Sequence, residues 1–135
     1  MNILAFIKPK NDVVFVYDDF TIKEAMDKLE KYRFTAIPIL NRDGNYVGTL
    51  SEGDILWKLR ASGSTLEIIQ REPVSLIKRF RDNAPIKMNA QMDELIGKAT
   101  DENFVPVVDD HNLFIGIVTR KVILNYFFEH RFIVL

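Results

Sequence analysis

Alternating apolar and polar positions predict two similar runs of short strands and amphipathic helices. In the first run, β-branched and aromatic residues at 13–17 predict a strand, and a helix follows from Thr21, where Thr-x-x-Glu spacing is typical of a capping box. Strands are predicted at 35–40 and 46–50, joined by a turn at 41–44, and a second helix begins at Ser51. The second run predicts a strand near 86–88, a helix at 91–100, strands at 104–108 and 113–118, and a helix to about residue 130. Each run therefore has the order strand–helix–strand–turn–strand–helix.

The second run repeats the first 68 residues later over its two longer strands and second helix, and 70 residues later over its first helix. Residues 36–41 align with 104–109, and residues 46–48 align with 114–116. Each copy carries a strand proline, Pro38 or Pro106, at the same distance before a glycine, Gly48 or Gly116. A repeat of this size predicts two structural halves. We expect a first half at 1–65, which includes the N-terminal segment, and a second at 66–135, which includes a linker at 66–84.

Composition narrows the class of protein. The chain of 135 residues has no cysteine, which excludes disulfides, thiolate nucleophiles and cysteine-based metal sites. Its net charge of −1 disfavours general nucleic-acid binding, and its uncharged runs are far shorter than a membrane-spanning segment. The N-terminus lacks the pattern of a signal peptide, so we expect a cytoplasmic protein. His111 and His130 have no ligand-type neighbours and no catalytic motif is present, so neither a metal site nor an enzyme is expected.

Two copies of one motif carry a family resemblance. Residues 36–55 read Ala-Ile-Pro-Ile-Leu-Asn-x-x-Gly-x-Tyr-Val-Gly-Thr-Leu-Ser-x-x-Asp-Ile. The second copy reads Val-Pro-Val-Val-Asp…Phe-Ile-Gly-Ile-Val-Thr-x-x-Val-Ile and ends at residue 123. This pattern resembles a tandem pair of CBS domains, or Bateman module, of the stand-alone bacterial type. The resemblance implies an α+β or α/β fold in which two β-α-β-β-α halves form one compact module with pseudo-two-fold symmetry. It also implies two clefts between the halves for adenosine-containing ligands, and frequent homodimers.

The residues that begin the second helix of each half differ in chemistry. Ser51 and Thr119 stand where free backbone N–H groups favour an anion such as phosphate. Ser51-x-x-Asp54 is equally an ordinary N-cap, and the resemblance implies that Asp54 also binds ribose hydroxyls. The second copy has Val in place of that Asp and carries Arg120 and Lys121 instead. These two cations either hold an anion or are surface residues placed there by chance.

The resemblance implies that the opposite half completes each cleft. The cleft at Ser51 and Asp54 would be completed by Met88, Asn103, Phe104, Val105 and Pro106, and the cleft at Thr119 by Phe15, Val16, Thr35, Ala36, Ile37 and Pro38. Each apolar residue in these sets could instead be a core residue. Phe104 either stacks on a base or fills the pocket. The basic run at 78–81 is either a solvated patch or a contact for a polyphosphate.

These observations predict a non-catalytic regulatory module without an obligatory cofactor. We expect it to bind AMP, ADP, ATP or cyclic di-AMP and to signal to a partner protein through a conformational shift. The order Thr-basic-basic-Val at 119–122, together with residues 35–38, resembles stand-alone bacterial CBS pairs that bind cyclic di-AMP. The alternative is a ligand-free interaction module whose clefts are filled by side chains. Neither a nucleic acid nor a membrane is expected as a partner.

Overall fold

The chain forms two compact units in the computed structural model, which describes the backbone of residues 1–134 and the side chains of residues 1–130. One is the central unit, Val14–Asp82. The other is the outer unit, in which Met1–Val13 packs with the chain from Asn83 onward. This grouping differs from the expected division at residue 65. Residues 66–82 stay with the first half because they contribute buried side chains to its core, and residues 1–13 join the second half because they pair with its sheet.

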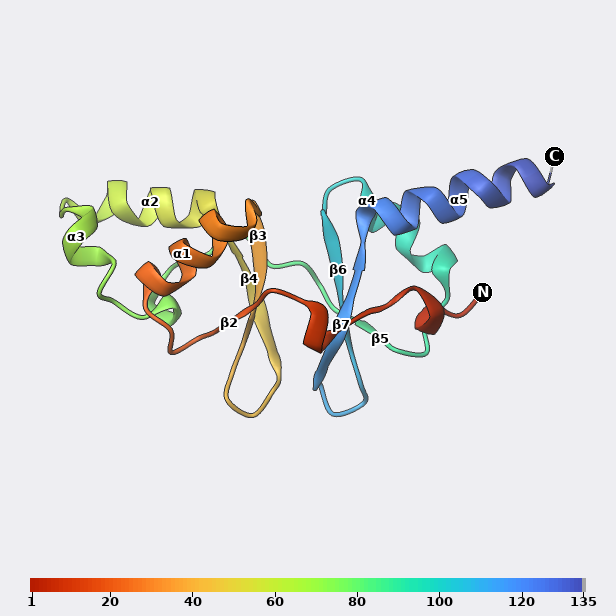
Figure 1. The fold of residues 1–135 in the computed structure, drawn as a ribbon, viewed down its shortest axis with the longest axis horizontal. Coiled ribbons are helices and arrows are strands. Elements are labelled where there is room, and N and C mark those ends of the chain that lie inside the picture. The colour runs from red at the N-terminus through yellow and green to blue at the C-terminus, as the bar shows by residue number, and fades with distance from the viewer. Residues whose placement is uncertain (135) are drawn as a thin grey trace. The chain divides into compact units, whose positions relative to one another are not determined.

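The central unit is a three-stranded sheet covered by helices (Figure 1). Its strands are β2 (Val16–Tyr17), β3 (Ala36–Leu40) and β4 (Tyr46–Ser51), in the order β2-β3-β4. Strand β2 is parallel to β3, and β3 is antiparallel to β4. The helices are α1 (Ile22–Tyr32), α2 (Glu52–Ser62), α3 (Leu66–Ile69) and a short 3-10 turn at Val74–Leu76.

Local signals fix the helices of the central unit where the pattern predicts them. Thr21 and Glu24 form a capping box at the start of α1, and Ser51 and Asp54 form another at the start of α2. Helix α2 ends at Gly63, which adopts the left-handed conformation with φ 64°. The core beneath the helices is apolar and includes Val16, Ile22, Leu29, Ile37, Leu50, Ile55, Val74 and Ile77.

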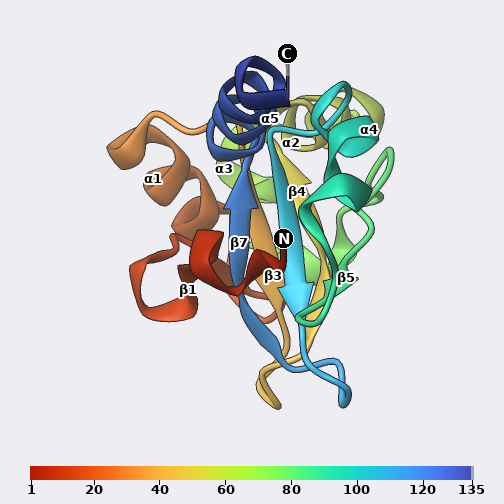
Figure 2. The same ribbon diagram turned by 90° about the vertical axis from the view of Figure 1, so that its right-hand side faces the viewer.

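The outer unit has a four-stranded sheet in the order β1-β7-β6-β5 (Figure 2). Its elements are a 3-10 turn at Ile3–Phe6, β1 (Lys8–Pro9), a 3-10 turn at Lys10–Asp12, β5 (Ile86–Lys87), a 3-10 turn at Met92–Leu95, α4 (Ile96–Ala99), β6 (Phe104–Val108), β7 (Phe114–Thr119) and α5 (Arg120–Val134). Strands β5 and β6 are parallel, and β6 and β7 are antiparallel, as in the central unit.

Three elements depart from the predicted pattern. The first strand shortens to Val16–Tyr17, and the helix expected at 91–100 splits into a 3-10 turn and the single turn of α4. Strand β1 was not predicted, and it pairs with β7 at Gly116. A Cβ built at Gly116 would lie 2.2 Å from the carbonyl oxygen of Lys8, so glycine is what allows this close approach. The expected α+β class is confirmed, with one sheet in each unit.

No helix among residues 1–134 is long and apolar enough to cross a membrane.

Candidate functional site

The carboxylate of Asp54 is held by two backbone N–H groups of the central unit. Its Oδ2 accepts from the Ser51 N–H at 3.1 Å, while Ser51 Oγ accepts from the Asp54 N–H at 3.1 Å. Its Oδ1 accepts from the N–H of Phe80 at 3.0 Å. Asp54 is only 5% exposed. The residue therefore caps α2, as one of the two interpretations of the sequence proposed, and it also fixes a segment 26 residues further along the chain.

We call residues 77–82 the connector, because they end at the boundary between the two units. Arg79 forms a bidentate pair with Asp82, with distances of 2.7 Å from Nε to Oδ1 and 3.2 Å from Nη2 to Oδ2. Asp82 Oδ1 also accepts from the N–H of Thr49 at 2.9 Å, which places the connector along the free edge of β4. A Cβ at Gly48 would lie 2.5 Å from Asp82 Oδ1, so glycine lets the connector approach the strand. The hydrogen bond from Thr49 to Asp82 thus links the connector to β4, and Arg79 and Gly48 allow Asp82 to take this position.

Electrostatics stabilise this arrangement. Burial raises the pKa of Asp82, but hydrogen bonds from Arg79 and the Thr49 N–H, together with the charge of Arg79, lower it below its ordinary value overall. The hydrogen bond to Asp82 raises the pKa of Arg79. The pair is therefore ionised at neutral pH.

The start of α5 repeats the backbone geometry of α2 with different side chains. Thr119 Oγ1 accepts from the N–H of Val122 at 3.3 Å, but Val122 has no carboxylate to complete a capping box. The N–H of Arg120 donates to the Asn103 carbonyl at 2.9 Å, and its Nε donates to the Glu102 carbonyl at 3.0 Å. Lys121 is exposed. The helix start therefore carries two cationic side chains where the first copy has a carboxylate, and its N–H groups at Arg120 and Val122 already have acceptors.

The residues expected to wall the Thr119 cleft belong to the central unit and divide between two faces of its sheet. Val16 and Ile37 lie in the hydrophobic core beneath the helices, with exposures of 0% and 1%. Ala36 and Pro38 alternate with Ile37 along β3 and point to the opposite face. Thr35 is exposed and its carbonyl accepts from the Glu52 N–H at 3.0 Å. Phe15 is partly buried, and its carbonyl accepts from Lys28 Nζ at 2.7 Å.

The residues expected to wall the Ser51 cleft belong to the outer unit and show the same alternation. Val105 lies in the core of that unit. Phe104 is buried at 5% exposure, and its carbonyl accepts from the side-chain amide of Asn83 at 2.9 Å. Pro106 is also buried. Asn103 is exposed, and Met88 is 37% exposed. Of this set, Asn103 and Met88 are the residues with side chains open to solvent.

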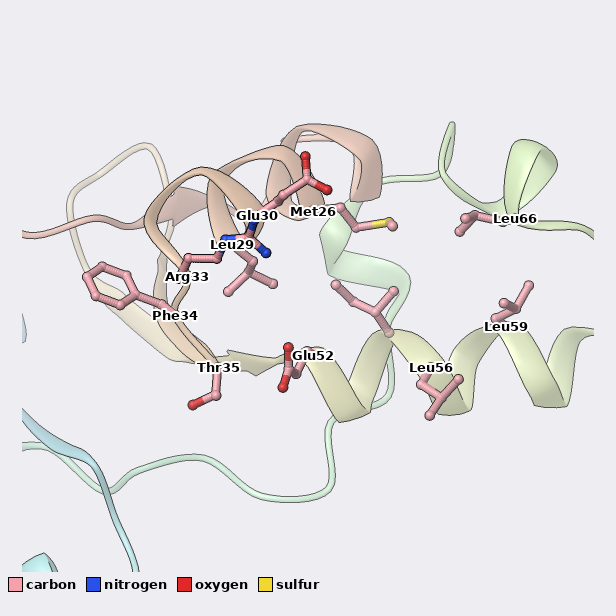
Figure 3. A pocket seen from close by; sticks show the side chains of 11 residues that line it. Met26, Leu29, Glu30, Arg33, Phe34, Thr35, Glu52, Leu56, Leu59 and Leu66 are labelled. Carbon is pink, nitrogen blue, oxygen red and sulfur yellow. The ribbon is translucent and has the colours of Figure 1, made fainter.

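A cavity of about 460 Å³ opens between α1 and α2 of the central unit (Figure 3). Its lining is mostly aliphatic and includes Leu56, Leu59 and Leu66. Glu30, Arg33 and Glu52 place charges at its margin (Figure 3). The complete lining is Met26, Leu29, Glu30, Arg33, Phe34, Thr35, Glu52, Ile55, Leu56, Leu59 and Leu66. Thr35 is the predicted site residue in this set.

Both histidines make contacts with residues close in sequence. The backbone N–H of His111 donates to Asp109 Oδ1 at 2.8 Å, and His130 Nδ1 lies 2.8 Å from the Tyr126 carbonyl oxygen. Within the described part of the chain, no three His, Asp or Glu side chains gather as metal ligands would.

The connector is the part of this region that the sequence did not reveal. The basic run at 78–81 was visible as charge, but its contacts depend on Asp82, Thr49 and Gly48. Asn83, with its buried amide, was likewise missed. A Gly in a strand and an Asp beside an Arg were the available signals, and neither specifies a partner.

Comparison with known proteins identifies the repeated unit. The model of the CBS domain matches residues 6–61 and 79–129. Among solved structures, CbpB in complex with c-di-AMP has a TM-score of 0.84 and 27% identity, with coverage of 98% of this chain and 89% of that chain. Listeria monocytogenes CbpB, also in complex with c-di-AMP, has a TM-score of 0.82 and 25% identity, with coverage of 98% and 99%.

Curated relatives are longer. An uncharacterized protein of Methanocaldococcus jannaschii is 27% identical over 111 residues, and the chain spans 59% of its length. Inosine-5'-monophosphate dehydrogenase of the same organism is 23% identical over 114 residues, and the chain spans 21% of it. Since the family model matches most of the chain in two copies, and both units have the corresponding fold, this chain belongs to the CBS domain family as a tandem pair.

Proposed function

We propose that this chain is a non-catalytic regulatory module that binds an adenine nucleotide, and that cyclic di-AMP is the preferred ligand. The observation that carries the proposal is the likeness, along nearly the whole of both chains, to two CbpB structures in complex with c-di-AMP. The alternative remains a ligand-free interaction module.

The two helix starts favour cyclic di-AMP over AMP, ADP or ATP. Both oxygens of Asp54 already accept a backbone N–H, so a ribose must share them or displace Phe80. The start of α5 offers the cationic side chains of Arg120 and Lys121, which together suit a phosphodiester. Val16, Ile37 and Val105 lie in the two hydrophobic cores, so the proposed contacts for the bases and sugars are the other predicted residues, among them Ala36 and Pro38 of β3 and Phe104 and Pro106 of β6.

The mechanism that we propose is a population shift. A ligand that contacts residues of both units would favour one relative arrangement of them, and a partner protein would bind that arrangement.

A second molecule of this chain is a further proposed partner. The aliphatic cavity of Figure 3 has acidic and basic groups at its margin, so a second copy could pair charges there while it buries Leu56 and Leu59. Size-exclusion chromatography with light scattering tests this, because Leu56→Asp should yield monomers.

A binding titration tests the ligand. We expect cyclic di-AMP to bind, and Arg120→Ala to weaken binding by roughly 10- to 100-fold, as for the loss of charge-assisted hydrogen bonds. Asp54→Ala should leave the dissociation constant of cyclic di-AMP unchanged, and so should the control Lys8→Ala, which removes an exposed charge in β1. Loss of binding in Asp54→Ala but not in Arg120→Ala would reverse the assignment in favour of a mononucleotide. The absence of binding by cyclic di-AMP, AMP, ADP and ATP would favour the ligand-free module.

A further inference from the structure

A second groove lies on the central unit, on the side of α2 that faces away from the cavity of Figure 3. Its volume is about 400 Å³. The groove is lined by Trp57, Lys58, Ala61, Ser62, Leu76 and Lys78. Lys78 belongs to the basic run at 78–81, for which a polyphosphate contact was one interpretation of the sequence, and the other five residues lie outside the predicted nucleotide site. We call it the Trp57 groove.

The lining combines exposed apolar surface with cations. Trp57 and Leu76 are 59% and 58% exposed, and both line this one groove, so they present apolar surface at the same place. They come from separate segments, since Trp57 lies on α2 and Leu76 on the 3-10 turn before the connector. Both segments are anchored, because Ile55 of α2 and Val74 of the turn are buried in the core. The groove is therefore a fixed feature of this unit.

The two lysines of the groove differ in their partners. Lys58 Nζ lies 3.0 Å from Glu72 Oε2. Lys78 is exposed and makes no hydrogen bond or ion pair with any of the residues that the structure describes. An apolar groove with an unneutralised ammonium at its margin is complementary to an apolar side chain next to a carboxylate.

We propose that the Trp57 groove docks an acidic amphipathic segment of the protein that this module regulates. Apolar side chains of the segment would cover Trp57 and Leu76, and its carboxylates would pair with Lys78. This inference rests on the proposed regulatory function and names the chemistry of its partner. The groove lies beside the connector, which begins one residue after Leu76 and reaches Asp54 through Phe80. Docking is thereby placed next to the segment that joins the two units.

The single tryptophan of the chain reports on the groove directly. The probe is a synthetic helical peptide with leucine on one face and glutamate on the other. We expect it to shift the Trp57 emission to shorter wavelength in a saturable way, and the matched peptides with glutamine or lysine in place of glutamate to bind at least about fivefold more weakly. Lys78→Glu and Leu76→Ser should each weaken binding, both with Trp57 intact. Lys31→Glu, an equal charge change on α1, should not.

Other outcomes overturn the proposal. Equal shifts with all three peptides would show that charge does not select the occupant. A shift with phosphatidylglycerol vesicles but not with the peptide would indicate a lipid surface. An emission maximum that changes on dilution of the protein alone would indicate a second copy. Nucleotide binding by Leu76→Ser should stay unchanged, so a failure of the groove and a failure of the nucleotide proposal are distinguishable.

Discussion

Replacing Asp54 with alanine tests the role of its carboxylate in the central unit. The substitution removes the acceptor of two N–H groups, those of Ser51 and Phe80. Each partly buried N–H that loses its acceptor costs about 1–2 kcal/mol, so the free energy of unfolding should fall by about 2–4 kcal/mol. For a chain of this length that corresponds to a decrease in Tm of roughly 6–15 °C.

Glu52→Ala is the matched control. Glu52 lies in the same first turn of α2, is exposed, and interacts with the helix dipole without holding the connector. We expect it to cost less than about 1 kcal/mol. A second readout separates capping from connector docking. Lys78, Arg79 and Arg81 are trypsin sites within the connector, and release of Phe80 should make them more susceptible to limited proteolysis.

The reasoning would be refuted by two results. If the Tm of Asp54→Ala falls by less than about 3 °C, water replaces the carboxylate as hydrogen-bond acceptor at little cost in stability. If the Tm falls as expected but trypsin cleavage at 78–81 is unchanged, Asp54 stabilises α2 and does not hold the connector. Asp54→Asn adds a graded test, because it keeps an acceptor for one N–H and should destabilise less than alanine.

Two further predictions concern the contacts around the same strands. Gly116→Ala should lower the free energy of unfolding in urea more than Gly48→Ala does. The new methyl group meets the backbone oxygen of Lys8 in the first variant, whereas in the second it meets the side chains of Asp82 and Arg79, which can move. Equal decreases in the free energy of unfolding would contradict this reasoning. The lowered pKa of Asp82 means that its ionised form stabilises the fold above the ordinary value of 3.8, and that this stabilisation is lost as the pH falls through the lower folded value. The acid unfolding curve of the Asp82→Asn variant should therefore be flatter below pH 3.8 than that of the wild type, and superimposable curves would exclude the effect.

The elements with local signals were predictable from the sequence. Both capping boxes of the central unit, the turn at 41–44 and strand β6 follow from side chains within a few positions of one another. The repeat itself identified the family because spacing survives where residue identity does not. Such signals depend on chemistry within one turn of chain, which a single sequence displays.

The elements that escaped prediction depend on partners distant in sequence. Strand β1 is two residues long and exists because β7 offers an edge at Gly116. The connector is ordered by Thr49 and Asp54, both at least 26 residues away. No pattern within such a short segment specifies its partner, so neither secondary-structure propensity nor hydrophobic periodicity predicts these contacts. The division at residue 65 differs from the packing units for the same reason.

The two halves share a scaffold but not a chemistry, and the difference bears on how the module could work. At the start of α2 a carboxylate is occupied by backbone N–H groups and holds the connector in place. At the start of α5 the carboxylate is replaced by Val122, and the helix begins with two cations, Arg120 and Lys121. An anionic ligand would therefore be attracted to the second start and repelled from the first. A ligand bound at the start of α5, with the connector held at the start of α2, makes the two halves functionally different, which two equivalent sites would not do.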